Sequence, residues 1–117
     1  VAVLYDAPSL KAQKLYLLGR DYPLEVVVKL ENWMKVRDAT GELAWVEKKY
    51  LSGKRTVLVT VPLADIRQTP DDHSPPVFHA EQNVLLELLE FSVPGWIKVR
   101  HRDGQTGYMR TSQVWGG

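Results

Sequence analysis

The sequence contains no cysteine among its 117 residues. This absence excludes disulfide bonds, thiolate zinc sites, iron–sulfur clusters and cysteine nucleophiles. An excess of one charge is also lacking, because 15 Lys and Arg residues stand against 14 Asp and Glu residues and leave a net charge of +1. A protein that binds nucleic acid by neutralising phosphates usually carries a large positive charge, so the composition argues against that class.

Long hydrophobic runs are missing as well. None approaches the roughly 20 apolar residues that a membrane helix needs, so we expect no membrane insertion. The 44% of hydrophobic residues still suffices for a core and argues against disorder. The length fits one ordinary domain or two very small ones. A first residue other than Met suggests a processed chain, which is compatible with a removed secretory signal.

An internal repeat is the main feature of what is present. Trp33–Arg37 recurs as Trp96–Arg100, a shift of 96 − 33 = 63 residues. Further upstream the shift is 70 − 8 = 62, which aligns Pro8 with Pro70 and residues 24–27 with residues 86–89. One residue has therefore been inserted between Phe91 and Trp96. The repeat predicts two equivalent domains, residues 1–60 (copy one) and residues 61–117 (copy two).

The repeated segments have the pattern of β-strands. Met34 and Val36 alternate with Lys35 and Arg37, the period of two expected of a strand with one buried face. The segments that follow, residues 38–41 and 101–104, end in glycine and are typical of hairpin turns. These patterns predict an all-β fold.

One segment conflicts locally with an all-β fold. Residues 80–91 are rich in Ala, Glu, Gln and Leu, a composition that by itself favours a helix. The counterpart in copy one, residues 23–28, contains a proline and a run of valines, which make a helix implausible. Because repeated units share a fold, we predict that residues 84–91 form a strand.

Three motifs in each copy resemble those of bacterial SH3-like domains. They are a Pro-ended opening (residues 3–8 and 65–70), a Trp-x-Lys-Val strand, and a closing Gly-x-x-Ala/Gly-Trp/Tyr pattern followed by Tyr50-Leu51 or Gln113-Val114. The resemblance implies two tandem SH3-like small β-barrels of five to six strands, as often found in exported proteins. Copy one is more divergent, because Leu4-Tyr5 replaces the family's Val-Arg pair, which copy two retains in part as Ile66-Arg67.

Copy one also resembles eukaryotic SH3 domains, which bind Pro-rich peptides between aromatic rings, in the segment Leu4-Tyr5-Asp6. That similarity is limited, because Lys11 and Lys14 occupy a loop in which acidic residues are usual. The bacterial group fits the sequence better.

Motifs for catalysis or metal binding are absent. The chain has no nucleophile elbow, phosphate-binding glycine loop or dinucleotide fingerprint, and its three histidines lack metal-ligand spacing. Asp71-Asp72-His73 is the one acidic and histidine cluster, and we interpret it, like His79 and His101, as solvated loop residues. We likewise interpret Lys98, Arg100 and Arg102 as a solvated strand face rather than a phosphate-binding stripe. We therefore expect no enzyme, no cofactor, no metal and no nucleic-acid partner.

Aromatic residues are the best candidates for a binding site, because binding modules rely on them. By position in the SH3-like pattern, the candidate ligand-binding residues are Tyr5, Trp33, Tyr50, Trp96, Tyr108 and Trp115. Strand alternation points Trp33 outward with Lys35. We expect Trp33 and Trp96 in equivalent places, at least one of them partly exposed in a groove that also includes Tyr5 or Tyr50 in copy one. The alternative is that both indoles are covered. Trp45 and Tyr108, in the closing strand, are expected mainly in the core.

The resemblance implies a non-catalytic binding or scaffolding module of a bacterial envelope protein that recognises peptidoglycan or its stem peptides. Two alternatives remain: a module that binds an extended or Pro-containing peptide of a protein partner, and an accessory domain of an enzyme encoded elsewhere. We expect an exported, periplasmic or envelope-associated protein.

The junction of the copies suggests a shared strand. Residues 57–61 are a strong strand signal that follows copy one, whereas copy two stops at Gly117 and lacks an equivalent. We therefore predict that this strand continues into residues 63–67, pairing with copy one at its start and with copy two at its end, since an unpaired edge is normally covered.

Overall fold

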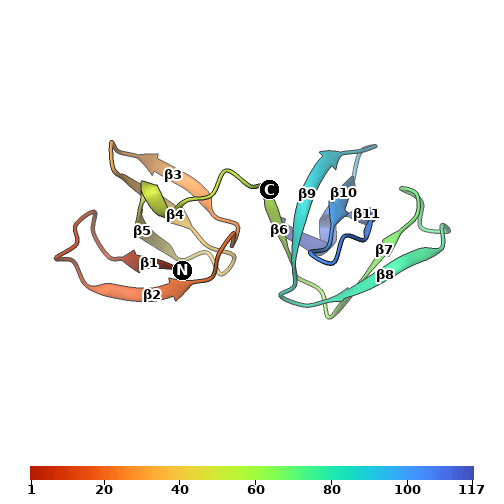
Figure 1. Cartoon of the computed structure of the whole chain (residues 1–117), viewed down its shortest axis with the longest axis horizontal. Helices are drawn as coiled ribbons and strands as arrows, with labels where there is room; N and C mark the ends of the chain where they lie inside the picture. The colour runs from red at the N-terminus through yellow and green to blue at the C-terminus, as the bar shows by residue number, and fades with distance from the viewer. The chain divides into compact units, whose positions relative to one another are not determined.

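The computed structural model describes residues 1–117, which form β-strands and two single 3-10 turns. The chain divides into unit 1, Val1–Lys54, and unit 2, Arg55–Gly117 (Figure 1). The prediction of an all-β fold of two SH3-like domains is confirmed. None of the helical segments has the length and apolar character of a membrane-crossing helix.

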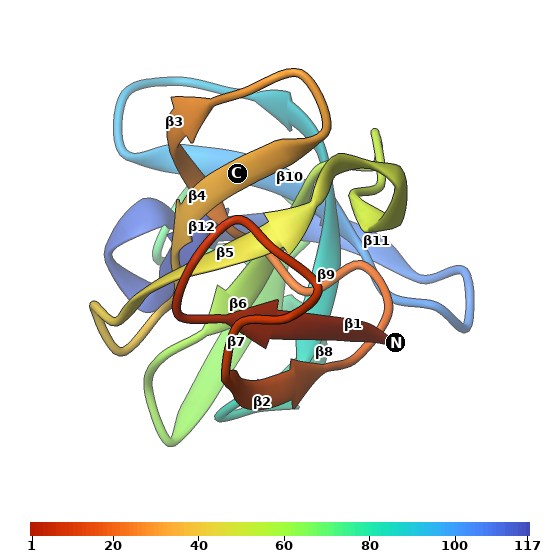
Figure 2. The ribbon, with the colours of Figure 1, turned by 90° about the vertical axis from the view of Figure 1, so that its left-hand side faces the viewer.

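Unit 1 is a five-stranded antiparallel sheet. Its strands are β1 (Ala2–Tyr5), β2 (Lys14–Leu18), β3 (Glu25–Lys29), β4 (Trp33–Arg37) and β5 (Leu43–Glu47), followed by the 3-10 turn η1 (Lys48–Tyr50). The strands follow one another in the order β2-β1-β5-β4-β3, which Figure 2 shows from bottom to top. β2 and β3 are therefore the edges of the sheet.

Unit 2 is a seven-stranded antiparallel sheet. Its elements are β6 (Thr56–Val59), β7 (Leu63–Arg67), β8 (Pro76–Glu81), β9 (Leu85–Phe91), β10 (Trp96–Arg100), β11 (Thr106–Arg110), η2 (Thr111–Gln113) and β12 (Val114–Gly116). The order is β12-β6-β9-β10-β11-β7-β8. Read from β8 to β9, it reproduces the strand order of unit 1 from β2 to β3. Unit 2 then adds β6 and β12 beyond β9.

The turns of the two units are equivalent in detail. Gly41 and Gly104 close the predicted hairpins with φ of 92° and 99°, a region that glycine adopts without strain. Asp21 and Asn83, which the 62-residue shift aligns, also have positive φ, at 62° and 73°. The internal repeat therefore extends to backbone conformation.

The strand prediction for residues 84–91 is confirmed, since β9 covers Leu85–Phe91. Leu86 and Leu88 point into the core, while Glu87 pairs with Arg100 on the other side, its Oε1 lying 2.7 Å from Nη2. The helix propensity of the segment is overridden because β9 has a partner strand on each side, β6 and β10.

The shared-strand prediction is wrong. β6 pairs with β9 along one edge and with β12 along the other, and both belong to unit 2. Copy two is not one strand short either, because β12, formed by its last residues, pairs with β6. The valine pattern identified the strand correctly, but alternation alone does not reveal which sheet takes it up.

Each unit has its own core. In unit 1 it consists of Leu4, Met34, Val36, Ala44 and Val46. Unit 2 buries their counterparts Ile66, Ile97, Val99 and Met109, and in addition Val57, Val59, Ala64, Ala80, Leu86 and Leu88. At the position of Ala44, unit 2 has Gly107, where a Cβ would lie 2.4 Å from Ile66 Cγ2.

Candidate functional site

The outer face of unit 1, on the side of β4 and β5 away from the core, carries a group of aromatic residues. Because Met34 and Val36 are buried, strand alternation places Trp33 and Lys35 on this face. Lys35 is directly opposite Trp45, and Trp33 is opposite Glu47. β1 adds Tyr5, whose Cα partner is Trp45. We call these five residues, Tyr5, Trp33, Lys35, Trp45 and Glu47, the open aromatic face.

Two aromatic rings of the open aromatic face are in direct contact. The rings of Tyr5 and Trp33 meet edge to face, with centroids 5.4 Å apart and an angle of 79° between the planes. This is a favourable geometry for aromatic pairs. Tyr5 is buried in the process, while Trp33 and Trp45 remain half-buried. The expectation that Trp33 is partly exposed beside Tyr5 is therefore confirmed, while the groove expected around them stays a prediction.

Tyr50 extends the aromatic character beyond β5. It lies in η1 with 51% of its surface exposed. Lys49 Nζ is 5.1 Å from the centre of the Tyr50 ring and 3.6 Å from Glu47 Oε2. Lys49 thus links Tyr50 to the rim of the open aromatic face.

Unit 2 presents the equivalent face with different residues. The repeat replaces Tyr5 by Arg67, Trp33 by Trp96, Trp45 by Tyr108 and Glu47 by Arg110, while Lys35 becomes Lys98. The pairings of Trp96 with Arg110 and of Lys98 with Tyr108 are those of unit 1. Trp33 and Trp96 therefore occupy equivalent places, as predicted. We call these five residues, Arg67, Trp96, Lys98, Tyr108 and Arg110, the capped face.

Arg110 covers the indole of Trp96. Its guanidinium carbon lies 4.6 Å from the ring centroid, and Trp96 is only 5% exposed. Arg110 is held by Asp72 through two hydrogen bonds, from Nε at 3.2 Å and from Nη2 at 2.5 Å. The hydrogen bond from Arg110 keeps the pKa of Asp72 below its usual value, and the pKa of Arg110 is raised in turn.

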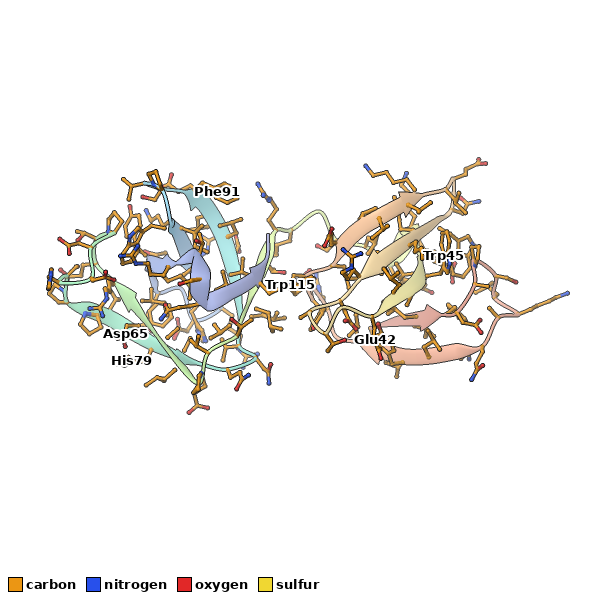
Figure 3. All side chains as sticks on the ribbon, turned by 180° about the vertical axis from the view of Figure 1, so that it is seen from behind. Glu42, Trp45, Asp65, His79, Phe91 and Trp115 are labelled. Carbon is orange, nitrogen blue, oxygen red and sulfur yellow. The ribbon has the colours of Figure 1, made fainter.

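Other charged residues of the capped face are also engaged. Arg67 donates to the Ser74 carbonyl at 2.8 Å and to Asp65 at 3.2 Å. Asp65 lies 2.9 Å from His79, and Figure 3 shows this pair on β7 and β8. Arg67 and Arg110 thus both bind the loop that contains Asp71-Asp72-His73, Arg67 through the Ser74 carbonyl and Arg110 through the Asp72 carboxylate.

Unit 1 lacks this cap. The counterpart of Asp72 is Leu10, which is 63% exposed, and the counterpart of Arg110 is the acidic Glu47. No cation of the unit 1 repeat therefore takes the place of Arg110 over Trp33. The difference leaves the indole of Trp33 more accessible than that of Trp96.

The remaining sequence predictions fare differently. Trp45 and Tyr108 were expected mainly in the core, and this is wrong: both are half-buried on the outer faces, because the buried residues of β5 are Ala44 and Val46 and those of β11 are Gly107 and Met109. Figure 3 labels Trp45 on β5. The alternation of Ala44 and Val46 with Trp45 is the sequence signal that points Trp45 to the outer face.

Trp115 lies on β12 opposite Leu58, on a strand remote from β10 and β11 in the sheet order.

No group of three or more His, Cys, Asp or Glu residues is arranged to hold a metal ion. The three histidines serve other contacts. His101 Nδ1 accepts from the Asp103 amide at 3.2 Å, the His73 amide donates to Asp71 at 2.8 Å, and His79 pairs with Asp65.

Comparison with protein-family models gives a match to both units. The family model described as bacterial SH3 domain matches residues 1–53 and 60–116. A search of curated proteins finds no match. Among solved structures, the chain is similar to NlpC2 and NlpC1 from Trichomonas vaginalis, with 18% and 20% identity, full coverage of this chain and a TM-score of 0.47 for each.

A third similar structure is an NlpC/P60 family protein from Bacillus cereus, with 23% identity over 79% of this chain and a TM-score of 0.43. The chain spans 44%, 42% and 35% of the lengths of these three proteins, which is less than half in each case.

Proposed function

Because the chain belongs to the bacterial SH3 domain family in both of its units, we propose that it is a non-catalytic binding module of the bacterial cell envelope. Its ligand is peptidoglycan or the stem peptides of peptidoglycan. The observation that carries the proposal is the open aromatic face of unit 1, where two half-buried indoles flank a lysine.

The chemistry of this face suits such a ligand. The flat faces of Trp33 and Trp45 offer apolar area at little cost in side-chain entropy, and aromatic residues dominate binding energies at interfaces. Lys35 lies two residues from Trp33 on β4 and directly opposite Trp45 on β5. It provides a cation for a ligand carboxylate beside both indoles. Carboxylates of stem peptides meet this requirement, and sugar rings or peptide backbone can lie along the indoles.

Retention on purified cell-wall sacculi tests the proposal. We expect the full chain to be retained, and Trp33→Ala or Trp45→Ala to weaken retention about 5- to 100-fold, the range of a residue central to an interface. Lys35→Glu, which leaves both indoles in place, should weaken it as well. Tyr108→Ala is the matched control, since it removes the counterpart of Trp45 from the capped face. Normal retention of both Trp33→Ala and Lys35→Glu would contradict the proposal.

A second candidate ligand is an extended or Pro-containing peptide of a protein partner. The edge-to-face contact of Tyr5 and Trp33 favours it, since polyproline segments dock between aromatic side chains. An array of Pro-rich peptides, probed in parallel with the sacculi, separates the two ligand classes. Binding to the array without retention on sacculi would select the peptide.

The envelope location is part of the same proposal. Antibody detection of the protein in separated cytoplasmic and envelope fractions of the native host tests it, with the protein expected in the envelope fraction.

A further inference from the structure

The indole of Trp96 in unit 2 has a cation on its outer side. The Arg110 guanidinium carbon lies 4.6 Å from the ring centroid of Trp96, and Asp72 holds the same guanidinium through two hydrogen bonds. The negative face of an aromatic ring attracts a cation, and tryptophan is the aromatic residue that does so best. The position over Trp96 is therefore a cation site that the protein fills with its own side chain.

Unit 1 has the same indole with the opposite charge beside it. Glu47 corresponds to Arg110, and its Cα partner is Trp33, just as the Cα partner of Arg110 is Trp96. A carboxylate beside an aromatic ring adds to the attraction of the ring for a cation. The indole of Trp33 and the carboxylate of Glu47 thus form the two walls of a cation site that unit 1 does not fill in the way unit 2 does.

Lys49 is a cation of unit 1 that pairs with Glu47. Its Nζ lies 3.6 Å from Glu47 Oε2 and 5.1 Å from the centre of the Tyr50 ring. The Lys49 side chain is 68% exposed, and exposed ion pairs of this kind contribute little. A ligand cation that contacts both Glu47 and Trp33 can therefore displace Lys49 from the carboxylate.

Lys35 determines what else such a ligand carries. It lies on the same face of β4 as Trp33, two residues further along the strand. Two residues of a strand span roughly 6.6 Å. A ligand with an ammonium group over Trp33 and a carboxylate on Lys35 therefore separates its two charges by about this length. A diamino acid at the carboxyl end of a peptide, with its side chain extended, has this arrangement of charges.

We propose that the open aromatic face binds the side-chain ammonium group of a diamino acid that ends a peptidoglycan stem peptide. The ammonium group lies over Trp33 and pairs with Glu47, and the terminal carboxylate pairs with Lys35. The ligand class rests on the proposed function, and these three residues narrow it to one end of the stem peptide. The capped face does not take this ligand, because Arg110 occupies the cation site there.

Two peptides that differ by one charge test the proposal on the isotope-labelled full chain by NMR. One is N-acetyl-L-Ala-γ-D-Glu-L-Lys, with a free lysine amine and a free terminal carboxylate, and in the other the lysine amine is acetylated. We expect the free-amine peptide to shift the indole N–H signal of Trp33 and to leave that of Trp96 unchanged. The acetylated peptide should need about fivefold more for half-saturation, the combined effect of an exposed cation–π contact and an exposed charge pair.

Variants at position 47 separate the charge from the packing. Glu47→Gln keeps the size of the side chain and should reduce the preference for the free amine to about twofold, because the cation–π contact alone remains. Glu47→Arg introduces the residue of the capped face and should abolish the preference. Glu42→Gln is the matched control, since Glu42, labelled in Figure 3, precedes the start of β5 whereas Glu47 ends it. The amide signals of β4 monitor the folding of unit 1 in each variant.

Three results would overturn the proposal. The first is equal half-saturation by the two peptides in the native chain, and the second is a preference that persists undiminished in Glu47→Arg. The third is equally tight binding of N-acetyl-Gly-Lys-Gly-amide, because its lysine is internal, as in a protein partner, and has no terminal carboxylate beside it.

Sacculi with acetylated amines separate this proposal from the proposed function. Equal retention of the full chain on untreated and on acetylated sacculi would overturn the ammonium site and leave the proposed function intact. A chain that distinguishes the two peptides but is not retained on untreated sacculi would support the ammonium site and contradict the proposed function.

Discussion

Tyr16 and Asp38 in unit 1 stand where Phe78 and His101 stand in unit 2. In unit 1 the Tyr16 hydroxyl donates to the Asp38 carboxylate at 2.8 Å. In unit 2 the Phe78 and His101 rings meet edge to face at 5.8 Å. Two chemically different pairs therefore hold the same strand, β2 or β8, to the same hairpin. Both members of the pair differ between the units, because a tyrosine hydroxyl needs a hydrogen-bond acceptor such as a carboxylate, whereas a phenylalanine ring packs against another ring.

The Asp38 carboxylate makes unit 1 sensitive to acid. Burial alone would raise its pKa, but hydrogen bonds from Thr40, Tyr16 and the Glu42 amide outweigh burial and lower it below 3.8. A lowered pKa in the folded state means that the stabilisation is complete above pH 3.8 and is lost as pH falls through the folded-state value.

We predict that Asp38→Asn lowers the free energy of unfolding of unit 1 by about 2 kcal/mol at pH 7, the usual cost of lost hydrogen bonds to a charged group. The difference from the native chain should shrink as pH falls towards 2.5. Urea unfolding followed at several pH values measures this, with Tyr16→Phe expected to show a smaller loss of about 1 kcal/mol. A constant difference across the pH range would contradict the assignment.

A second prediction concerns the cap over Trp96. Asp72→Asn removes the charge that holds Arg110, so the guanidinium should leave the indole and the indole should become more exposed. The indole N–H signal of Trp96 in NMR and its access to a soluble paramagnetic agent report the change. Asp71→Asn is the control, because the Asp71 carboxylate accepts from the His73 amide of its own loop, whereas Arg110 donates to Asp72. Unchanged access in Asp72→Asn would show that packing alone positions Arg110.

At the scale of whole elements, sequence patterns that occur in both copies predicted the strands correctly. The alternation of Met34 and Val36 gave the central strand, and the match of residues 24–27 to 86–89 overrode helix propensity in β9. What could not be predicted depends on residues far apart in sequence. Arg110 and Asp72 are 38 residues apart, and local alternation pointed Trp96 outward without showing what would cover it. Likewise, the valines of β6 gave no information on which sheet they join.

The position of β6 gives a third prediction. Val59 is fully buried in the core of unit 2, so Val59→Asn removes apolar burial and inserts an amide without a partner, at a cost of about 4 kcal/mol. We expect unit 2 to lose its dispersed NMR signals while unit 1 keeps those of β4 and β5. Val27→Asn, on exposed β3, is the control and should leave both units folded. Simultaneous loss of both units would revive the idea of a shared strand.

For the molecule as a whole, residues 1–117 form two sheets of different size, with five strands in unit 1 and seven in unit 2. Unit 2 has six core residues in addition to the counterparts of the unit 1 core, and they lie around β6. Each of the four Val and Leu side chains among them contributes roughly 1.5–3 kcal/mol before conformational entropy is subtracted. The two domains should therefore differ in stability although their central strands are almost the same.

Hydrogen exchange of matched amides gives the fourth prediction. Val36 and Val99 occupy equivalent places in β4 and β10, and both are fully buried. We expect the Val99 amide to exchange at least about tenfold more slowly, since 1.4 kcal/mol of additional stability corresponds to a factor of 10. Equal exchange rates would mean that β6 and β12 add nothing to the global stability of unit 2.

The pairing of β6 with β12 also determines how unit 2 responds to mechanical force. The Arg55 guanidinium donates to the Gly117 carbonyl at 2.7 Å, and Val57 is opposite Gly116, so the first and last residues of unit 2 lie at the same end of an antiparallel pair. Tension that separates these two residues loads the backbone bonds one after another, whereas tension between Thr60 and Gly117 loads them together in shear. Because the chain has no cysteine, cysteines introduced at chosen positions are the only attachment points for pulling handles. We expect unit 2 to open at a lower force when it is pulled from Arg55 and Gly117 than when it is pulled from Thr60 and Gly117. An SH3-like unit pulled from its two ends would therefore lose the pairing of β6 with β12 one hydrogen bond at a time.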